Sequence, residues 1–147
     1  MSFFKSMNVS ASGMTAERLR MDVMSRNIAN ANTTRTAAGT PYRRQVAVVR
    51  QIGGNNFGDV LSNRMGASGS GNGVEVTAVV EDQSPFKLVY NPGHPDADQE
   101  GYVMLPNVDT VTEMINMISA TRAYEANVTS LNSAKSMAMK ALRSEER

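Results

Sequence analysis

Apolar side chains recur every three or four residues at both ends of this chain, and the middle of the chain lacks this pattern. At the N-terminal end the pattern runs through Phe4, Met7, Ala11, Met14, Met21 and Ile28. At the C-terminal end it runs through Met114, Met117, Tyr124, Val128, Leu131, Ala138 and Leu142. This spacing places side chains on one stripe of an α-helix. The pattern therefore predicts two long helices, near 2–30 and 110–143, that pair with each other or with neighbouring subunits.

The two stripes are candidates for a packing seam in an assembly. We expect the seam to consist of Phe4, Met7, Met14, Met21, Ile28, Met114, Met117, Tyr124, Val128 and Leu131. Methionine is flexible and adapts to more than one packing partner, although ordinary core packing explains it equally well. Arg18, Ser25, Thr121 and Lys135 interrupt the stripes. These interruptions make the seam too polar for a strong free-standing coiled coil.

The N-terminal helix is expected to end in a cluster of polar residues. Asn27, Asn30 and Asn32 are followed by Thr33 and Thr34. Asparagine and threonine side chains compete with the helical backbone for hydrogen bonds, so they favour a stop and a change of direction. We therefore place the joint between the helical arm and the rest of the chain at Asn27, Asn30 and Asn32.

The middle of the chain reads as a small β-rich insert. Valine-rich or otherwise β-favouring runs predict strands at 42–51, 74–81, 86–90 and 102–105. Glycine, serine and asparagine dominate residues 53–73, which predicts a flexible loop. The predicted fold is therefore α+β. It has a helical arm with its junction at 1–34, an insert at 35–106, and a C-terminal helical segment at 107–147 that packs with 1–34 as a coiled-coil-like bundle.

The start of the C-terminal helix carries capping residues. Asn107 or Asp109 can cap the first turn. Thr110 and Glu113 have the spacing of a capping box, in which the two side chains satisfy free backbone N–H groups. The helix is expected to begin directly after these residues.

Composition excludes several classes of function. The formal net charge is +1 and no basic block occurs, so nothing indicates a nucleic-acid partner. The chain has no cysteine, which excludes disulfides and thiolate chemistry. No apolar run approaches the roughly 20 residues of a membrane span. The N-terminal residues lack the apolar core of a cleaved secretory signal, so we expect either a cytoplasmic protein or export by a route without such a signal.

The candidate chemical motifs are weak. His94 is the single histidine and lies among prolines and a glycine, which favours a surface turn over a metal site. Asp96, Asp98 and Glu100 lack calcium-loop spacing. The glycines at 69, 71 and 73 precede a strand and not a helix, unlike a phosphate-binding loop. We therefore expect no catalytic, cofactor-binding or metal-binding residues and no cofactor, and the chain is not expected to be an enzyme.

Both ends of the chain resemble flagellar rod and hook proteins. Residues 21–34, from Met21 to Thr34, resemble the N-terminal signature of that family. The C-terminal signature is matched by Asn107-Val108-Asp109, by residues 113–118 and by residues 122–127. Residues 91–98 and 101–108 are most similar to proximal subunits of the flagellar basal-body rod. The resemblance covers the chain except for about residues 53–73.

The resemblance implies a structural protein of the bacterial flagellar basal body. Such subunits are exported uncleaved by the flagellar type III apparatus. They assemble with copies of themselves and with other rod proteins into a tube that crosses the periplasm and transmits motor torque, which motility requires. The terminal helices would form the inner wall. The alternatives are a cytoplasmic helical adaptor or export chaperone, which flagellar secretion would exclude, and an enzyme, for which loss of function in His94→Ala with intact rods would argue.

Overall fold

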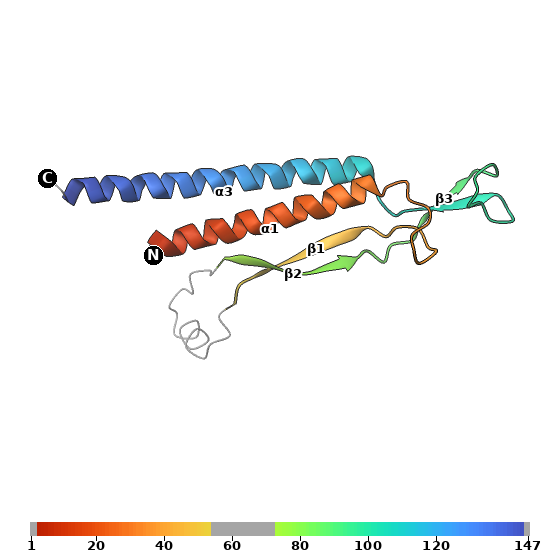
Figure 1. The fold of residues 1–147 in the computed structure, drawn as a ribbon, viewed down its shortest axis with the longest axis horizontal. Coiled ribbons are helices and arrows are strands. Elements are labelled where there is room, and N and C mark those ends of the chain that lie inside the picture. Colours follow the sequence, from red (N-terminus) through yellow and green to blue (C-terminus); the bar gives the residue numbers. More distant parts are fainter. Residues whose placement is uncertain (1–2, 54–72, 146–147) are drawn as a thin grey trace. The chain divides into compact units, whose positions relative to one another are not determined.

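The computed structural model describes residues 3–53 and 73–145, in an order of two long helices and four strands (Figure 1). The predicted flexible loop at 53–73 lies outside the described residues except for its two end glycines. The elements are α1 (Phe3–Ala29), β1 (Gln45–Gln51), β2 (Val74–Glu81), β3 (Lys87–Tyr90), β4 (Tyr102–Leu105) and α3 (Thr110–Glu145). Long helices at the two ends with a small β-rich insert between them confirm the predicted α+β fold class. Within the described residues, neither helix is apolar enough over its length to cross a membrane.

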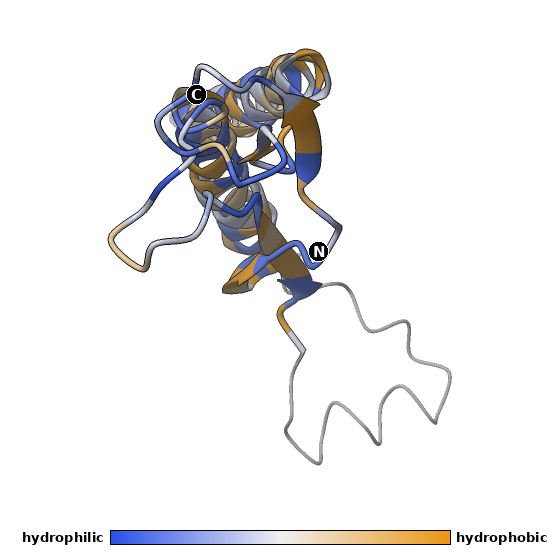
Figure 2. Ribbon diagram, turned by 90° about the vertical axis from the view of Figure 1, so that its right-hand side faces the viewer, coloured by the Kyte–Doolittle hydropathy of each residue, from blue (hydrophilic) through white to orange (hydrophobic). Residues whose placement is uncertain are grey.

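The strands form two separate two-stranded sheets. Strand β1 pairs with β2, and β3 pairs with β4. The second pair is antiparallel and sets Leu88 opposite Met104 and Tyr90 opposite Tyr102. Valine and other β-branched residues favour these strands, and hydrophobic residues recur along strands and helices alike (Figure 2). The first strand begins at Gln45, later than predicted, because the backbone N–H groups of Tyr42 and Arg44 bind the carbonyl of Thr33 and the side chain of Asn107 instead of a neighbouring strand.

The predicted capping box at the start of α3 is wrong. Asp109 caps the helix, since its Oδ1 accepts hydrogen bonds from the backbone N–H groups of Val111 at 3.0 Å and Thr112 at 3.3 Å. The carboxylate of Glu113 instead points into the protein and is 1% exposed. At the other helix, α1 ends at Ala29, where Asn30 donates from Nδ2 to the carbonyl of Arg26 at 2.9 Å. Asn30 therefore ends the helix as its position predicted.

The described chain divides into two compact units. The first comprises Met1–Arg18, Val49–Thr77 and Thr121–Arg147, and the second comprises Leu19–Val48 and Ala78–Ala120. In each unit a part of α1 lies beside a part of α3 (Figure 1). The buried apolar residues are Ala16 and Ala134 in the first unit, and Val23, Met24, Val103, Val108 and Ala120 in the second.

Small residues form the contact between the helices of the first unit. A Cβ atom added to Gly13 would lie 3.0–3.1 Å from the side chain of Asn127. Ala16 and Ala134 are both buried in the same unit. Small side chains allow close helix approach, and the close packing that results is sensitive to added volume.

Gly73 in the first unit provides a test of close backbone approach. Its φ is +102°, and an added Cβ would overlap the hydroxyl of Ser12, which also accepts the backbone N–H of Val74 at 3.1 Å. We expect Gly73→Ala to lower the free energy of unfolding by about 2–4 kcal/mol, from backbone strain and overpacking together. Gly39→Ala is the matched control, because φ is +77° there and nothing lies within 4 Å of the added Cβ. If urea unfolding gave equal losses of unfolding free energy for the two variants, the close approach of Ser12 to Gly73 would be contradicted.

Candidate functional site: the junction cluster

Asn27 is the most buried polar residue of the second unit and is fully shielded from solvent. Its Oδ1 accepts from the backbone N–H of Gln45 at 2.9 Å and from the Tyr42 hydroxyl at 3.0 Å. Its Nδ2 donates to the carbonyl of Gln45 at 2.8 Å and to Oε2 of Glu113 at 2.9 Å. One amide therefore joins the end of α1 to the start of β1 and to the first turn of α3.

Glu113 is the charged centre of the same site. Besides Asn27, its carboxylate binds Arg44, whose Nε donates to Oε1 at 2.8 Å. Burial alone lowers the pKa of Arg44, but its hydrogen bond and charge interaction with Glu113, helped by Asp82, outweigh that effect and raise the pKa. The guanidinium of Arg44 therefore supplies the positive charge that compensates the buried carboxylate of Glu113.

Two further residues connect the turn after β2 to this site. The pKa of Asp82 lies below its usual range, chiefly because its carboxylate accepts from the hydroxyl of Ser84 at 2.6 Å and from the backbone N–H of Ser84 at 2.9 Å. Asp82 also lies 3.3 Å from Arg44. Asn107 accepts the backbone N–H of Arg44 at 2.8 Å and donates to the carbonyls of Asp82 at 3.0 Å and Ser84 at 3.2 Å.

We call these residues the junction cluster: Asn27, Tyr42, Arg44, Asp82, Asn107 and Glu113. Burial raises the pKa of Tyr42, which keeps its hydroxyl a donor to Asn27 at neutral pH. Among the described residues, no buried side-chain nitrogen or oxygen lacks a hydrogen-bond partner. The hydrogen-bonding groups of the cluster bind one another and the backbone, so the arrangement holds segments together.

The three asparagines predicted as the joint have different environments. Asn27 is the centre of the cluster. Asn30 accepts from the hydroxyl of Thr33 at 3.2 Å and supports the turn after α1. Asn32 is exposed. Of the three, the structure gives the buried hydrogen-bonding role to Asn27.

The residues of the predicted seam lie on the surface or at its margin. Phe4 is 73% exposed and Met114 is 51% exposed. The others are half-buried: Met7, Met14, Met21, Ile28, Met117, Tyr124, Val128 and Leu131. None is fully buried within the described residues. Phe4 and Met114 are thus exposed, whereas the other eight seam residues are partly covered within the folded subunit.

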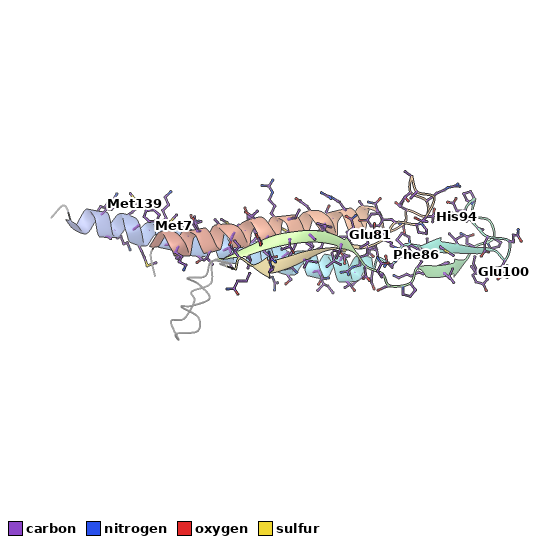
Figure 3. The ribbon with its side chains drawn as sticks, turned by 90° about the horizontal axis from the view of Figure 1, so that it is seen from below. Met7, Glu81, Phe86, His94, Glu100 and Met139 are labelled. Atoms are coloured by element: carbon purple, nitrogen blue, oxygen red, sulfur yellow. The ribbon has the colours of Figure 1, made fainter. Side chains whose placement is uncertain are left out.

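His94 lies in the turn between β3 and β4, as its sequence context predicted (Figure 3). Its Nδ1 accepts the backbone N–H of Asp96 at 3.1 Å. Among residues 3–53 and 73–145, no group of three or more histidine, cysteine, aspartate or glutamate side chains is placed to hold a metal ion. The histidine therefore has a role within the turn.

Sequence reasoning missed most of the junction cluster. Tyr42 and Arg44 were assigned to a strand, and Asn107 and Glu113 to helix capping. One available signal was the position of Glu113 on the same helical face as Ala120, Asn127 and Ala134, where small residues indicate close packing. The partners of Glu113 are far away in sequence, so no local pattern could identify them.

A buried cluster closed by its own groups, together with exposed large apolar residues on two helices, defines a structural subunit. Comparisons with known proteins agree. Residues 7–35 match the family described as flagella basal body rod protein, and residues 99–144 match the C-terminal family of flagellar basal body rod FlgEFG proteins.

Relatives match over nearly the full chain. The flagellar basal-body rod protein FlgC of Bacillus subtilis strain 168 is 52% identical over 147 residues, covering 97% of each chain. Those of Borreliella burgdorferi and Escherichia coli O157:H7 are 49% and 44% identical, covering 97% and 92% of each chain. The chain belongs to the flagellar basal-body rod protein family. It is a structural subunit of the flagellar basal body that assembles with other rod components, and it is not an enzyme.

Proposed function

We propose that the chain is a proximal subunit of the flagellar rod, and that it assembles with copies of itself and with other rod proteins into a helical tube. The tube crosses the periplasm and transmits motor torque, and the subunit reaches it through the flagellar type III export apparatus without cleavage. The similarity to rod proteins named FlgC over nearly the whole chain supports this placement.

The observation that carries the proposal is an exposed apolar face at the start of α3. Val111, Met114, Ile115 and Ile118 are all more than half exposed. Their spacing places them on one side of the helix, turned away from the buried Glu113 and Ala120. Contiguous exposed apolar groups mark interaction sites, because exposing them to water is unfavourable. Met114 belongs to the seam expected from the sequence, and we assign its exposed face of α3 to contacts between subunits.

Met114→Asp tests the seam. The side chain is exposed in the subunit, so the variant should fold normally, with an unchanged midpoint of urea unfolding. In the assembly the new carboxylate would be buried without a partner at a cost of several kcal/mol, enough to weaken a contact more than a hundredfold. We therefore expect loss of rod assembly and motility.

Thr112→Asp is the matched control for that variant. It adds the same charge at an exposed position two residues earlier, roughly 160° around the helix. An acidic residue in the first turn also suits the helix dipole. Motility close to that of the unchanged protein is expected for this control. Normal basal bodies in the Met114→Asp strain would contradict the proposed seam.

A further inference from the structure

The hairpin of β3 and β4 has one uncovered apolar face in the second unit. Its register places Leu88 opposite Met104 and Tyr90 opposite Tyr102 on the same face, and all four side chains are exposed. The rings of Tyr90 and Tyr102 meet edge to face with centroids 5.4 Å apart. The neighbouring position Val103 is buried on the opposite face. The hairpin therefore packs through Val103, whereas its cross-strand neighbour Val89 is 44% exposed. We call the face of Leu88, Tyr90, Tyr102 and Met104 the presenting face.

Gly101 fixes the conformation of the turn beside this presenting face. Its φ is +85°, and an added Cβ would come within 2.9 Å of the Tyr90 ring and 3.2 Å of Pro92. Only glycine fits a left-handed conformation this close to a ring without strain. The turn thus packs tightly against Tyr90, and the aromatic pair is preorganised.

The presenting face continues into a groove with an acidic rim. Tyr102, Met104, Pro41 and Pro95 contribute to its lining, and it holds about 380 Å³. The Thr34 hydroxyl donates to Asp96 at 2.8 Å and connects the two sides. Asp96 and Asp98 line the groove, and Glu100 is exposed in the same turn (Figure 3). Arg35, which also lines it, lies 3.8 Å from Asp96, so acidic charge is in excess.

The last turns of α3, in the first unit, have the opposite charge. Two apolar side chains are exposed there, Met139 (labelled in Figure 3) and Leu142. They are flanked by Lys135, Lys140 and Arg143. Lys135, Met139, Lys140 and Arg143 border one shallow depression on the helix surface. Within the described part of the chain, no ion pair is recorded for these three cations. We call residues 135–143 the basic tail segment.

We propose that the groove of one copy binds the basic tail segment of a second copy. The apolar side chains of Met139 and Leu142 would contact Tyr102 and Met104, and the flanking cations would face the acidic rim. Complementary charge around an apolar centre selects this occupant over an acidic or neutral one. Because the contact joins two different surfaces of identical chains, it can be repeated from one copy to the next. This contact rests on the proposed function only because it requires copies of the chain to be neighbours in the rod.

Disulfide cross-linking in basal bodies tests this contact. The chain contains no cysteine, so single variants report single positions. Cells producing Met104→Cys and Met139→Cys copies together should yield basal bodies in which oxidation joins the two copies, since a disulfide needs Cβ atoms about 4 Å apart. The matched control pairs Met104→Cys with Met137→Cys, because Met137 is exposed on the same segment but roughly 160° around the helix from Met139. We expect a several-fold higher yield for the first pair.

A charge swap gives a second readout through swimming, which needs no cysteine, and it can also be combined with the cysteine pair at positions 104 and 139. Lys140→Glu and Glu100→Lys should each lower swimming, and in basal bodies the cross-link yield, roughly two- to fivefold, as expected for loss of an exposed ion pair. Combining both changes in every copy should restore both quantities. Equal yields for the 104–139 and 104–137 pairs, no dimer in basal bodies that contain both variants, or additive losses in the combined variant would overturn the contact. Rod incorporation of the chain despite such a result would leave the proposed function standing.

Discussion

Replacement of Asn27 by alanine should lower the free energy of unfolding by about 3–5 kcal/mol, among the largest effects of a single substitution in this chain. The variant removes two hydrogen bonds to the backbone of Gln45, one from Tyr42 and one to Glu113. Each buried group left without a partner costs about 1–3 kcal/mol. Urea unfolding monitored by circular dichroism measures the loss.

Two further substitutions test whether the loss of stability comes from the buried side chain of Asn27. Asn32→Ala changes an exposed asparagine of the same segment and should cost less than about 0.5 kcal/mol. Asn27→Asp keeps the acceptor but places a second carboxylate beside Glu113. Burial and the negative charge of Glu113 would raise the folded-state pKa of the new carboxyl group. The stability of this variant relative to the unchanged protein should therefore increase as the pH falls. A loss for Asn27→Ala as small as that for Asn32→Ala would show that the cluster does not hold the junction.

Replacement of Arg44 by methionine should cost about 3–5 kcal/mol, because it leaves Glu113 buried without its counter-charge. Glu113 is only 1% exposed, whereas Arg44 retains some contact with solvent. Replacing both residues, Arg44→Met with Glu113→Leu, should recover part of this loss, since an apolar pair needs no charge compensation. A double-mutant cycle from urea unfolding gives the coupling free energy.

The chain offers a matched control in a second arginine–glutamate pair. Arg50 and Glu75 lie 2.9 Å apart, nearly the same distance as Arg44 and Glu113, but their side chains are 68% and 44% exposed. Exposed pairs contribute about 0–1 kcal/mol because water screens them. Arg50→Met should therefore cost less than about 1 kcal/mol. Equal costs for the two arginine variants would mean that burial of Glu113 has no energetic consequence.

The sequence predicted the helices and strands well because their signals are local. Periodic apolar positions placed α1 and α3, and runs of valine placed β1 and β2 within a few residues. The start of β1 was wrong by three residues, since the backbone N–H groups of Tyr42 and Arg44 bind Thr33 and Asn107, outside the sheet. Propensity cannot detect such long-range partners, and for the same reason Glu113 was misread as a capping residue.

The faces of the two helices show a second difference between the hydrophobic pattern and the structure. Each helix carries a small-residue face, with Ala16 on α1 and Ala120 and Ala134 on α3, next to a face of large apolar residues. Hydrophobic periodicity emphasises the larger side chains, so it found the stripe with Met114 and overlooked the small residues that are buried. Small residues thus contribute to the fold of the subunit, while Met114 and its neighbours on α3 remain exposed.

The most direct test of this account is hydroxyl-radical oxidation of Met114, measured by mass spectrometry in the isolated subunit and in purified basal bodies. We expect rapid oxidation in the subunit, where Met114 is 51% exposed, and strong protection after assembly. Met114 that oxidises equally fast in basal bodies would contradict the claim that its face of α3 is buried between rod subunits.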